Sequence, residues 1–410
     1  MKSDLDTLMQ ENNLEAILVT GSAQNNQPMV YLTGGVHMTG DMIKKRGAPA
    51  VLFYNPMERE EAARTGLQTK NLIDYPYNDL LQKANGDTVL AQAGRYQLML
   101  EDLGINSGRI ALYGQRDAGA SYGLFSTLQQ IMPGITLVGE LENSTLMQAR
   151  ETKDAAEIER ICRMGKVTTS VVGKVAEFLS SHQVRQSTLI KKDGEPLTIG
   201  DVKKRINVWL TEQGATAPEG VIFAIGRDAG IPHSSGTFSN VLRLGQSIVF
   251  DIYPCEIGGG YCYDFTRTWS LGYASDELIA LHETVRKAYD KAFAELKVGS
   301  HCRDYQKMVC DLFEAAGHST IQSDPKTTKG YVHGLGHGIG LEVHERPFMG
   351  ARATEKDVIK PGIVITVEPG LYYPDQGMGV RLEDTVWIRP DGQAEILAPY
   401  PLDLVIPVKQ

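Results

Sequence analysis

Two pairs of apolar, strand-forming segments each place one acidic residue on either side of a glycine-containing link, which restricts how the chain can fold. In the first pair, residues 248–254 carry Asp251 and residues 261–268 carry Asp264, with glycines at 258–260 between them. If those glycines form the turn, the two aspartates face each other across an antiparallel hairpin, where opposed side chains come within about 5 Å. This hairpin must therefore border a buried polar site.

The second pair repeats the arrangement with glutamates. Glu368 and Glu383 are centred on Asp375 and Gln376, next to Gly377. Like charges opposed on apolar strands repel one another and are costly to bury, so they need a compensating cation. A single acid in such a segment is usually a surface or ion-paired residue. Four carboxylates with an imidazole form an oxygen-rich set suited to two adjacent divalent ions, with one or two carboxylates bridging.

The imidazoles are concentrated in residues 331–345. This segment contains three of the nine histidines, His333, His337 and His344, interleaved with glycines at 334, 336, 338 and 340. A lone buried histidine is usually a packing residue with satisfied ring nitrogens. Three together favour a site, because imidazole is both a common transition-metal ligand and a proton shuttle near neutral pH. We expect the glycines to let the backbone approach a bound ion or substrate closely.

The length of 410 residues predicts two or three domains, and the texture of the sequence changes near Arg150. Residues 1–150 alternate strand and helix patterns, which predicts a small α/β domain. We expect strands at 16–20, 29–33, 49–54, 110–113 and 135–138, and helices at 57–67 and at 3–13, the latter capped by Ser3.

Residues 151–410 form the second predicted domain. Capping residues at 151–157 introduce a long amphipathic helix. Further helices are expected at 201–214, 276–296 and 303–316, a loop at 182–200, and strands at 221–225, 247–254, 261–271, 362–368 and 379–388.

The first domain shows no cluster of catalytic residue types. His37, Asp41, Lys44, Lys45 and Arg46 are its densest polar group. They could face a neighbouring active site, but a solvated loop is the interpretation that the sequence favours.

Composition excludes several classes of partner. The chain is 42% hydrophobic and 22% charged, and its net charge of −9 gives no basic surface for nucleic acid or an anionic membrane. No apolar run is long enough for a membrane helix, and the start lacks an apolar targeting segment, so we expect a mature cytoplasmic chain beginning at Met1. The five cysteines are expected to be reduced thiols, although Cys255 and Cys262 could lie near each other across the first hairpin.

Five residues and their flanks resemble the pita-bread metallopeptidases, the group containing methionine aminopeptidase, prolidase and aminopeptidase P. They are Asp251, Asp264, His337, Glu368 and Glu383, within His-Gly-Leu-Gly-His-Gly-Ile-Gly-Leu-Glu-Val-His-Glu, Val-Glu-Pro-Gly-Leu-Tyr and Val-Arg-Leu-Glu-Asp-Thr. The resemblance implies an α+β fold with a pita-bread catalytic domain at 151–410. The preceding residues 1–150, with Tyr-Leu-Thr-Gly at 31–34, are similar to the creatinase-type N-terminal α/β domain of the Xaa-Pro branch.

The resemblance also implies the metal ligands. Asp251 would bind one ion, His337 with Glu368 the other, and Asp264 and Glu383 would bridge them. A hydroxide held between the ions would be the nucleophile. Manganese suits an oxygen-rich site with one histidine best, and cobalt, zinc or iron also fit.

Substrate-contacting roles follow from the same resemblance. Glu368 would accept a proton, and His233 and His344 would contact the substrate and stabilise the tetrahedral intermediate. His333 matches a histidine beside the pocket for proline. Arg381 would orient the carboxylates or the substrate, or equally form a plain ion pair with a ligand acid.

The expected activity is hydrolysis of the bond between an N-terminal residue and proline, by a Xaa-Pro aminopeptidase or dipeptidase acting as a homodimer. Methionine aminopeptidase-like activity is the nearest alternative, opposed by the extra N-terminal domain and by His333. A metal-free creatinase-like amidinohydrolase would not need all five ligands, and non-catalytic peptide-binding relatives typically lose ligands. The sequence leaves open whether the substrate is a dipeptide or a longer peptide.

Overall fold

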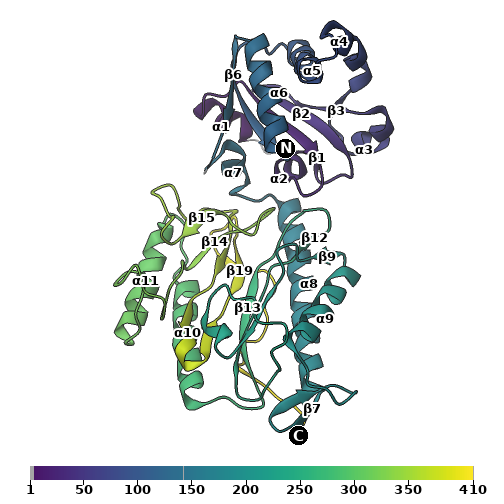
Figure 1. The fold of residues 1–410 in the computed structure, drawn as a ribbon. Helices are drawn as coiled ribbons and strands as arrows, with labels where there is room; N and C mark the ends of the chain where they lie inside the picture. Colours follow the sequence, from purple (N-terminus) through teal and green to yellow (C-terminus); the bar gives the residue numbers. More distant parts are fainter. Residues whose placement is uncertain (1–3, 142, 410) are drawn as a thin grey trace. The chain divides into compact units, whose positions relative to one another are not determined.

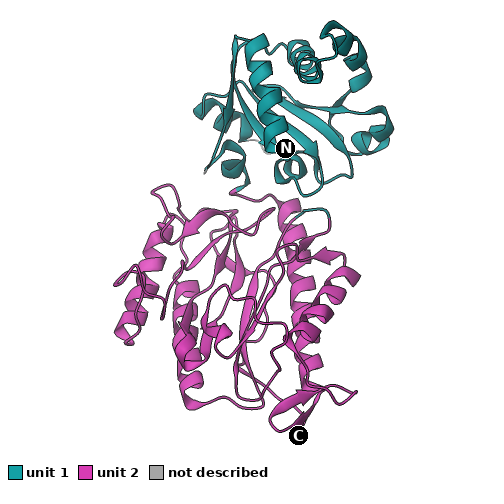
Figure 2. Ribbon diagram, viewed as in Figure 1, with its two compact units in different colours: residues 1–150, 258–260 teal, residues 151–257, 261–410 magenta. Residues whose placement is uncertain are grey.

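The computed structural model describes residues 4–141 and 143–409, and the chain forms two compact units (Figures 1 and 2). Unit 1 comprises residues 1–150 together with 258–260, and unit 2 comprises residues 151–257 and 261–410. The division near Arg150 coincides with the change in sequence texture. The assignment of the two parts as a creatinase-like domain and a catalytic domain stays a prediction.

Unit 1 is built on a mixed six-stranded sheet with strand order β4-β3-β2-β1-β5-β6. Side chains that alternate along β1 enter two separate clusters, Ile17 and Val19 on one face and Ala16 and Leu18 on the other, so both faces of the sheet are covered. The strands are β1 (Ala16–Ser22), β2 (Thr39–Lys45), β3 (Ala50–Tyr54), β4 (Gln68–Asn71), β5 (Gly108–Gly114) and β6 (Ile135–Gly139).

The helices of unit 1 pack on these two faces. One cluster receives Met9, Met29 and Leu146, and the other receives Tyr96 and Leu128. The helices are α1 (Leu5–Glu11), α2 (Gln27–Thr33), α3 (Arg59–Arg64), α4 (Tyr77–Lys83), α5 (Thr88–Asp102), α6 (Ala118–Ile131) and α7 (Thr145–Arg150).

Three expectations for unit 1 need correction. Residues 29–33 form part of helix α2 and not a strand, because a proline occupies its first turn and Gly34 ends it in the left-handed conformation with φ 81°. Helix α1 has Asp4 at its N-cap position, and Ser3 lies outside the described residues. Part of the expected polar loop is strand β2, which contains Asp41, Lys44 and Lys45.

Lys44 explains why a polar segment can form an inner strand. Its side chain is 2% exposed, and the ammonium donates to Asp6 Oδ1 at 2.5 Å and to the carbonyls of Lys45 and Ala48 at 3.0 and 2.7 Å. A buried ammonium is tolerated when its hydrogens are paired in this way. The charged partner, Asp6, comes from helix α1, so no pattern within the segment itself predicts the strand.

Unit 2 contains four long helices, and the first two have strong start signals. Asp154 and Glu157 form a reciprocal capping box at the start of α8, and Thr198 and Asp201 form another at α9. A large apolar cluster joins α10 and α11 to the strands around residues 363–388. The helices are α8 (Ala155–Ser180), α9 (Ile199–Glu212), α10 (Asp276–Ala294) and α11 (Cys302–Ala315).

Two main sheets of unit 2, with strand orders β10-β11-β13-β21 and β15-β14-β16-β19-β20, supply most of the remaining framework. They are joined by a bridge between Thr266 and Glu383. Their strands are β10 (Ile222–Ile225), β11 (Ser247–Ile252), β13 (Phe265–Leu271), β21 (Val405–Ile406), β14 (Gly336–Gly338), β15 (Glu345–Met349), β16 (Val364–Val367), β19 (Asp384–Ile388) and β20 (Ala394–Ile396).

Three two-stranded ladders complete unit 2. The expected loop at 182–200 contains the hairpin of β7 (Gln183–Arg185) and β8 (Thr188–Ile190). The others pair β9 (Ala215–Thr216) with β12 (Cys255–Glu256), and β17 (Gly370–Tyr373) with β18 (Met378–Arg381).

The two predicted acid pairs differ in register. Val367 pairs with Asp384 and Gly370 with Arg381, and this common register places Glu368 opposite Glu383 as expected. In the first hairpin, however, Asp251 pairs with Thr266, so the prediction that Asp251 faces Asp264 directly is wrong. Asp264 lies just before β13 and approaches the site from the end of that strand.

The same hairpin corrects the cysteine prediction. Cys255 and Cys262 form a disulfide, whereas Cys162, Cys302 and Cys310 are free. The possible proximity noted across the hairpin is therefore realised, and the expectation of five reduced thiols is wrong.

Among the described residues, no helix is both long enough and apolar enough to cross a membrane.

Candidate metal and substrate site

All nine residues singled out in the sequence line one cavity of 1120 Å³ within unit 2. They come from strand ends and loops that are distant in sequence but adjacent in the fold. They are His233, Asp251, Asp264, His333, His337, His344, Glu368, Arg381 and Glu383. The structure therefore brings the whole predicted set together, and the individual roles remain predictions.

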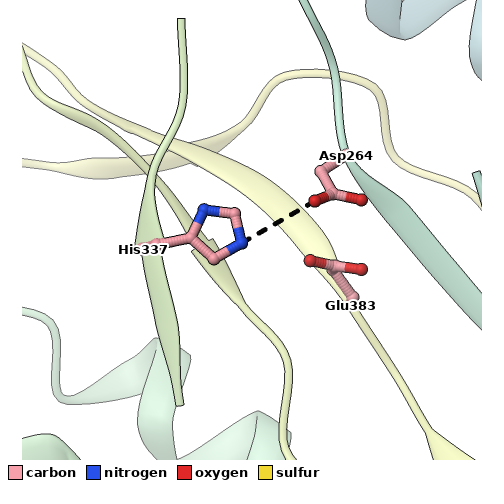
Figure 3. Close-up of side chains that lie close together, drawn as sticks. All are labelled: Asp264, His337 and Glu383. Carbon is pink, nitrogen blue, oxygen red and sulfur yellow. Dashed lines mark ion pairs between the residues drawn. The ribbon is translucent and has the colours of Figure 1, made fainter. Parts of the chain in front are cut away.

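The tightest group in the described part of the chain that could hold a metal ion consists of Asp264, His337 and Glu383. One potential ligand atom from each lies within 4.8 Å of the others, and all three side chains are buried. Figure 3 shows the imidazole of His337 directed toward the two carboxylates. His337 Nε2 is 3.7 Å from Asp264 Oδ2 and 3.4 Å from Glu368 Oε1, so a fourth predicted ligand borders the group.

The tautomer of His337 follows from its hydrogen bond. Nδ1 lies 3.0 Å from the Gly338 carbonyl, which can only accept, so Nδ1 carries the proton. Burial and the neighbouring His344 lower the pKa of His337 to about 3, which keeps the ring neutral. Nε2 therefore presents its lone pair to the carboxylates, as a metal-binding imidazole does.

The carboxylates are electrostatically frustrated without a cation. Burial, followed by the charges of neighbouring acids, raises the pKa of Asp264 and of Glu383 well above the ordinary range. Burial raises the pKa of Glu368 to about 8, against the opposing effect of Arg381. Asp251 Oδ1 and Glu383 Oε1 are buried without any hydrogen-bond partner. Oxygen donors that lack partners and repel one another fit divalent ions.

Arg381 pairs with one of the predicted ligands. Its Nη2 donates to Asp251 Oδ2 at 2.5 Å, and the guanidinium is 3% exposed. Of the two roles left open for this residue, the ion pair with a ligand acid is present in the structure. Because the contact uses only Oδ2, Oδ1 of Asp251 stays available to another cation.

Arg381 also begins a directed hydrogen-bond chain that ends at His333. Its Nη1 donates to the Tyr372 hydroxyl at 2.7 Å, and that hydroxyl lies 2.8 Å from His333 Nε2. His333 Nδ1 lies 2.7 Å from the carbonyl of Gly334, an obligatory acceptor, so Nε2 must accept from Tyr372. Burial and the charge of Arg381 lower the pKa of His333 to about 3. The ring is thus neutral and fixed, with both nitrogens occupied.

His344 and His233 are the more exposed histidines of the cavity. The His344 ring centroid is 4.3 Å from that of His337, which places a potential hydrogen-bond donor beside the candidate metal group. Both rings are accessible to a molecule in the cavity, unlike the buried His337.

Two glycines of residues 331–345 lie tightly against neighbouring strands. A Cβ atom on Gly336 would lie 2.1 Å from the Thr366 carbonyl oxygen, and one on Gly338 would lie 2.0 Å from that of Arg346. These two glycines therefore permit close approach of neighbouring strands, and Gly336 also lines the cavity.

Two contributors to the site were missed from the sequence. The Thr266 hydroxyl donates to Glu383 Oε2 at 2.6 Å, and Tyr372 joins Arg381 to His333. Tyr372 ends the segment Val-Glu-Pro-Gly-Leu-Tyr, and Thr266 lies two residues beyond Asp264. The available signal for Thr266 was its spacing of two residues from Asp264, because residues two apart on a strand point to the same face.

Comparison with known proteins identifies the family. The sequence profile of metallopeptidase family M24 matches residues 159–390. The chain belongs to this family. Among curated M24-like relatives, it is 26% identical over 347 residues to the uncharacterized peptidase YqhT of Bacillus subtilis, covering 84% of this chain and 89% of that protein. It is 25% identical over 394 residues to a Xaa-Pro dipeptidase of Pyrococcus horikoshii, covering 95% and 94%.

Solved structures of M24 peptidases share the fold across nearly the whole chain. A Xaa-Pro dipeptidase from Bacillus anthracis superposes with a TM-score of 0.75 at 22% identity, covering 98% of this chain and 97% of that one. An X-Pro aminopeptidase from Thermotoga maritima gives a TM-score of 0.73 at 23% identity, covering 96% and 97%. The M24 peptidase described here has the mixed α/β pita-bread fold, which confirms the expected fold class.

Proposed function

We propose that this metallopeptidase is a dinuclear-metal exopeptidase that hydrolyses the bond between an N-terminal residue and proline. The observation that carries the proposal is the neutral, immobilised ring of His333, whose Nδ1 lies 3.9 Å from Glu368 Oε2 at the edge of the candidate metal group. With both nitrogens engaged, this ring offers a flat, uncharged surface to the residue that follows the scissile bond. A proline ring suits that surface, since it needs packing and has no amide hydrogen to donate.

The carboxylates of Asp251, Asp264, Glu368 and Glu383, with His337, would hold the ions. Manganese is the first candidate, and cobalt, zinc or iron are alternatives. When bound, the ions would polarise the scissile carbonyl and lower the pKa of a water molecule.

Glu368 is the proposed proton acceptor. Burial and the negative charge of Asp251 favour its protonated form, so its carboxylate readily takes a proton at Oε1 or Oε2 during attack on the carbonyl. The neighbouring His337 is too weak a base for this role, because burial and the charge of His344 lower its pKa to about 3.

His344 and His233 would contact the substrate. His344 stands beside His337, so its ring nitrogen can donate to the oxygen on which negative charge develops. His233 lines the same cavity and would donate to the carbonyl of the proline residue. Their accessibility suits groups that bind and release substrate.

The test compares manganese-loaded protein on Ala-Pro, Ala-Pro-Ala and Met-Ala-Ser. We expect proline-containing substrates to be cleaved and Met-Ala-Ser to be inert. The His333→Leu variant should lose rate on the proline substrates while retaining its metal, and His337→Ala should lose both metal and turnover. Cleavage of Met-Ala-Ser alone would favour a methionine aminopeptidase-like activity, and full activity of His337→Ala would refute the ligand assignment.

A cytoplasmic location is also proposed, and a homodimer is proposed on family resemblance alone. Sedimentation of the purified protein tests the dimer.

A further inference from the structure

Lys203 is a buried cation in the wall of the cavity. It lies on α9, is 7% exposed, and donates from Nζ to the Ser235 carbonyl at 2.5 Å. Its ammonium also lies 5.2 Å from the centroid of the Phe238 ring. Among the described residues, no carboxylate lies within ion-pair distance of it, and burial lowers its pKa with no acid opposing the shift. A buried ammonium usually has a paired anion, so this one has unused binding capacity.

Three other buried cations among the described residues are paired with acids. Lys44 contacts Asp6, Lys153 contacts Glu345, and Arg267 contacts Asp384. Lys203 differs from them in lining an open cavity, where a counter-ion can arrive from solution. The unpaired charge is therefore placed where a ligand can use it.

Lys203 lies on the same wall of the cavity as His233, a proposed substrate-binding residue. The Ser235 carbonyl that it binds is two residues after His233, and Lys203, His233 and Ser235 all line the same cavity as the candidate metal group. His233 is proposed above to contact the carbonyl of the proline residue. A group joined to that carbonyl carbon would lie on the same wall as the ammonium.

We infer that Lys203 binds the free carboxylate of a Xaa-Pro dipeptide and makes this protein a dipeptidase in preference to an aminopeptidase for longer peptides. The inference rests on the proposed Xaa-Pro activity. In a dipeptide, one carbon separates the scissile nitrogen from the carboxylate, so the negative charge must enter the cavity beside His233. In a longer peptide, the same position holds a neutral amide that cannot act as the counter-ion.

A structural role for Lys203 is the competing explanation. The hydrogen bond to Ser235 could serve only to fasten the loop at 231–238 to α9. The two explanations differ in one measurable respect: a carboxylate-binding lysine discriminates between charged and uncharged substrates of the same shape, whereas a fastening lysine affects both equally.

The experiment measures kcat/KM for Ala-Pro and for its C-terminal amide, Ala-prolinamide, with manganese-loaded wild type, Lys203→Met, Lys203→Arg and Lys204→Met. Wild type should prefer the acid. A charge-assisted hydrogen bond predicts that Lys203→Met loses roughly 10- to 100-fold on Ala-Pro, mainly through KM, with little change on the amide. Lys203→Arg should keep part of the preference.

Lys204 is the matched control, because it is the next residue of α9 and lines the same cavity but is exposed. Lys204→Met should leave the acid-to-amide ratio unchanged. If Lys203→Met loses rate equally on both substrates at unchanged metal content and melting temperature, this inference is overturned and the proposed Xaa-Pro activity stands. The same holds if wild type cleaves acid and amide equally. If wild type cleaves neither, the proposed function falls and the inference falls with it.

Discussion

Removal of the metal should make the folded protein less stable as the pH rises, the reverse of the trend set by ordinary paired carboxylates. Glu368 makes the clearest contribution to this loss of stability, because burial raises its pKa to about 8 from the usual 4.5. An acid that is harder to ionise in the folded state than in the unfolded state binds more protons when folded. Its stabilising effect is complete below its unfolded pKa and is lost as the pH rises through about 8.

The magnitude follows from proton linkage. Between about pH 5.5 and pH 8.5, a shift of this size removes about 3 kcal/mol from the free energy of unfolding, since each pKa unit corresponds to about 1.4 kcal/mol. Asp264 and Glu383 change in the same direction, because their pKa values are also raised. A divalent ion in the site would favour the ionised carboxylates and abolish the trend.

The assay is urea denaturation of chelator-treated protein across this pH range, repeated with saturating manganese. Glu368→Gln is the control, because the carboxamide has a similar shape and does not titrate. The variant should lose about 3 kcal/mol of the pH dependence of the metal-free protein. The reasoning is refuted if metal-free wild type is as stable at pH 8.5 as at pH 5.5, or if Glu368→Gln keeps the full slope.

Three further outcomes are expected. Lys153→Met should cost about 3–5 kcal/mol in urea denaturation, because the buried Glu345 carboxylate 2.9 Å away loses its cation; a loss below about 1 kcal/mol would contradict this. Tyr372→Phe should lower kcat/KM on Ala-Pro roughly tenfold at unchanged metal content, because it leaves His333 Nε2 without its donor and breaks the link to Arg381. Wild-type activity of this variant would count against the hydrogen-bond chain. Alkylation in urea without reductant should label three cysteines, Cys162, Cys302 and Cys310, whereas labelling of five would exclude the disulfide.

The set of residues that lines the site could be predicted from local sequence. The contacts between those residues could be predicted only in part. The Glu368–Glu383 register follows from its chain midpoint because flanking ladders on both sides keep one register. The Asp251–Asp264 register does not, because Asp251 pairs with Thr266 and Asp264 precedes the strand. The ladder and the bridge between Cys255 and Cys262 share one register, centred between Gly258 and Gly259, and the spacing of Asp251 and Asp264 is offset from that centre.

Two predictions for unit 1, the strand at 29–33 and the polar loop that is partly strand β2, were wrong for different reasons. Val30, Tyr31 and Thr33 have strand-favouring side chains, yet a proline in the first turn and a left-handed glycine after the last enforce helix α2. Those end signals were local and could have been weighted more heavily. In β2, by contrast, the burial of Lys44 depends on the carboxylate of Asp6 in helix α1, which only the tertiary fold brings beside the strand.

Charge at the site favours two ions over one. The four carboxylates proposed as ligands and Arg381 together leave three negative charges unbalanced when all are ionised. One divalent ion would leave the site negative and repel an oxyanion forming on the substrate, whereas two would make it positive and stabilise that oxyanion. Arg381 is essential to this balance, because it is a permanent cation that takes one oxygen of Asp251 and leaves the other free. Without it, two divalent ions would only neutralise the carboxylates, and the positive field that the reaction needs would be absent.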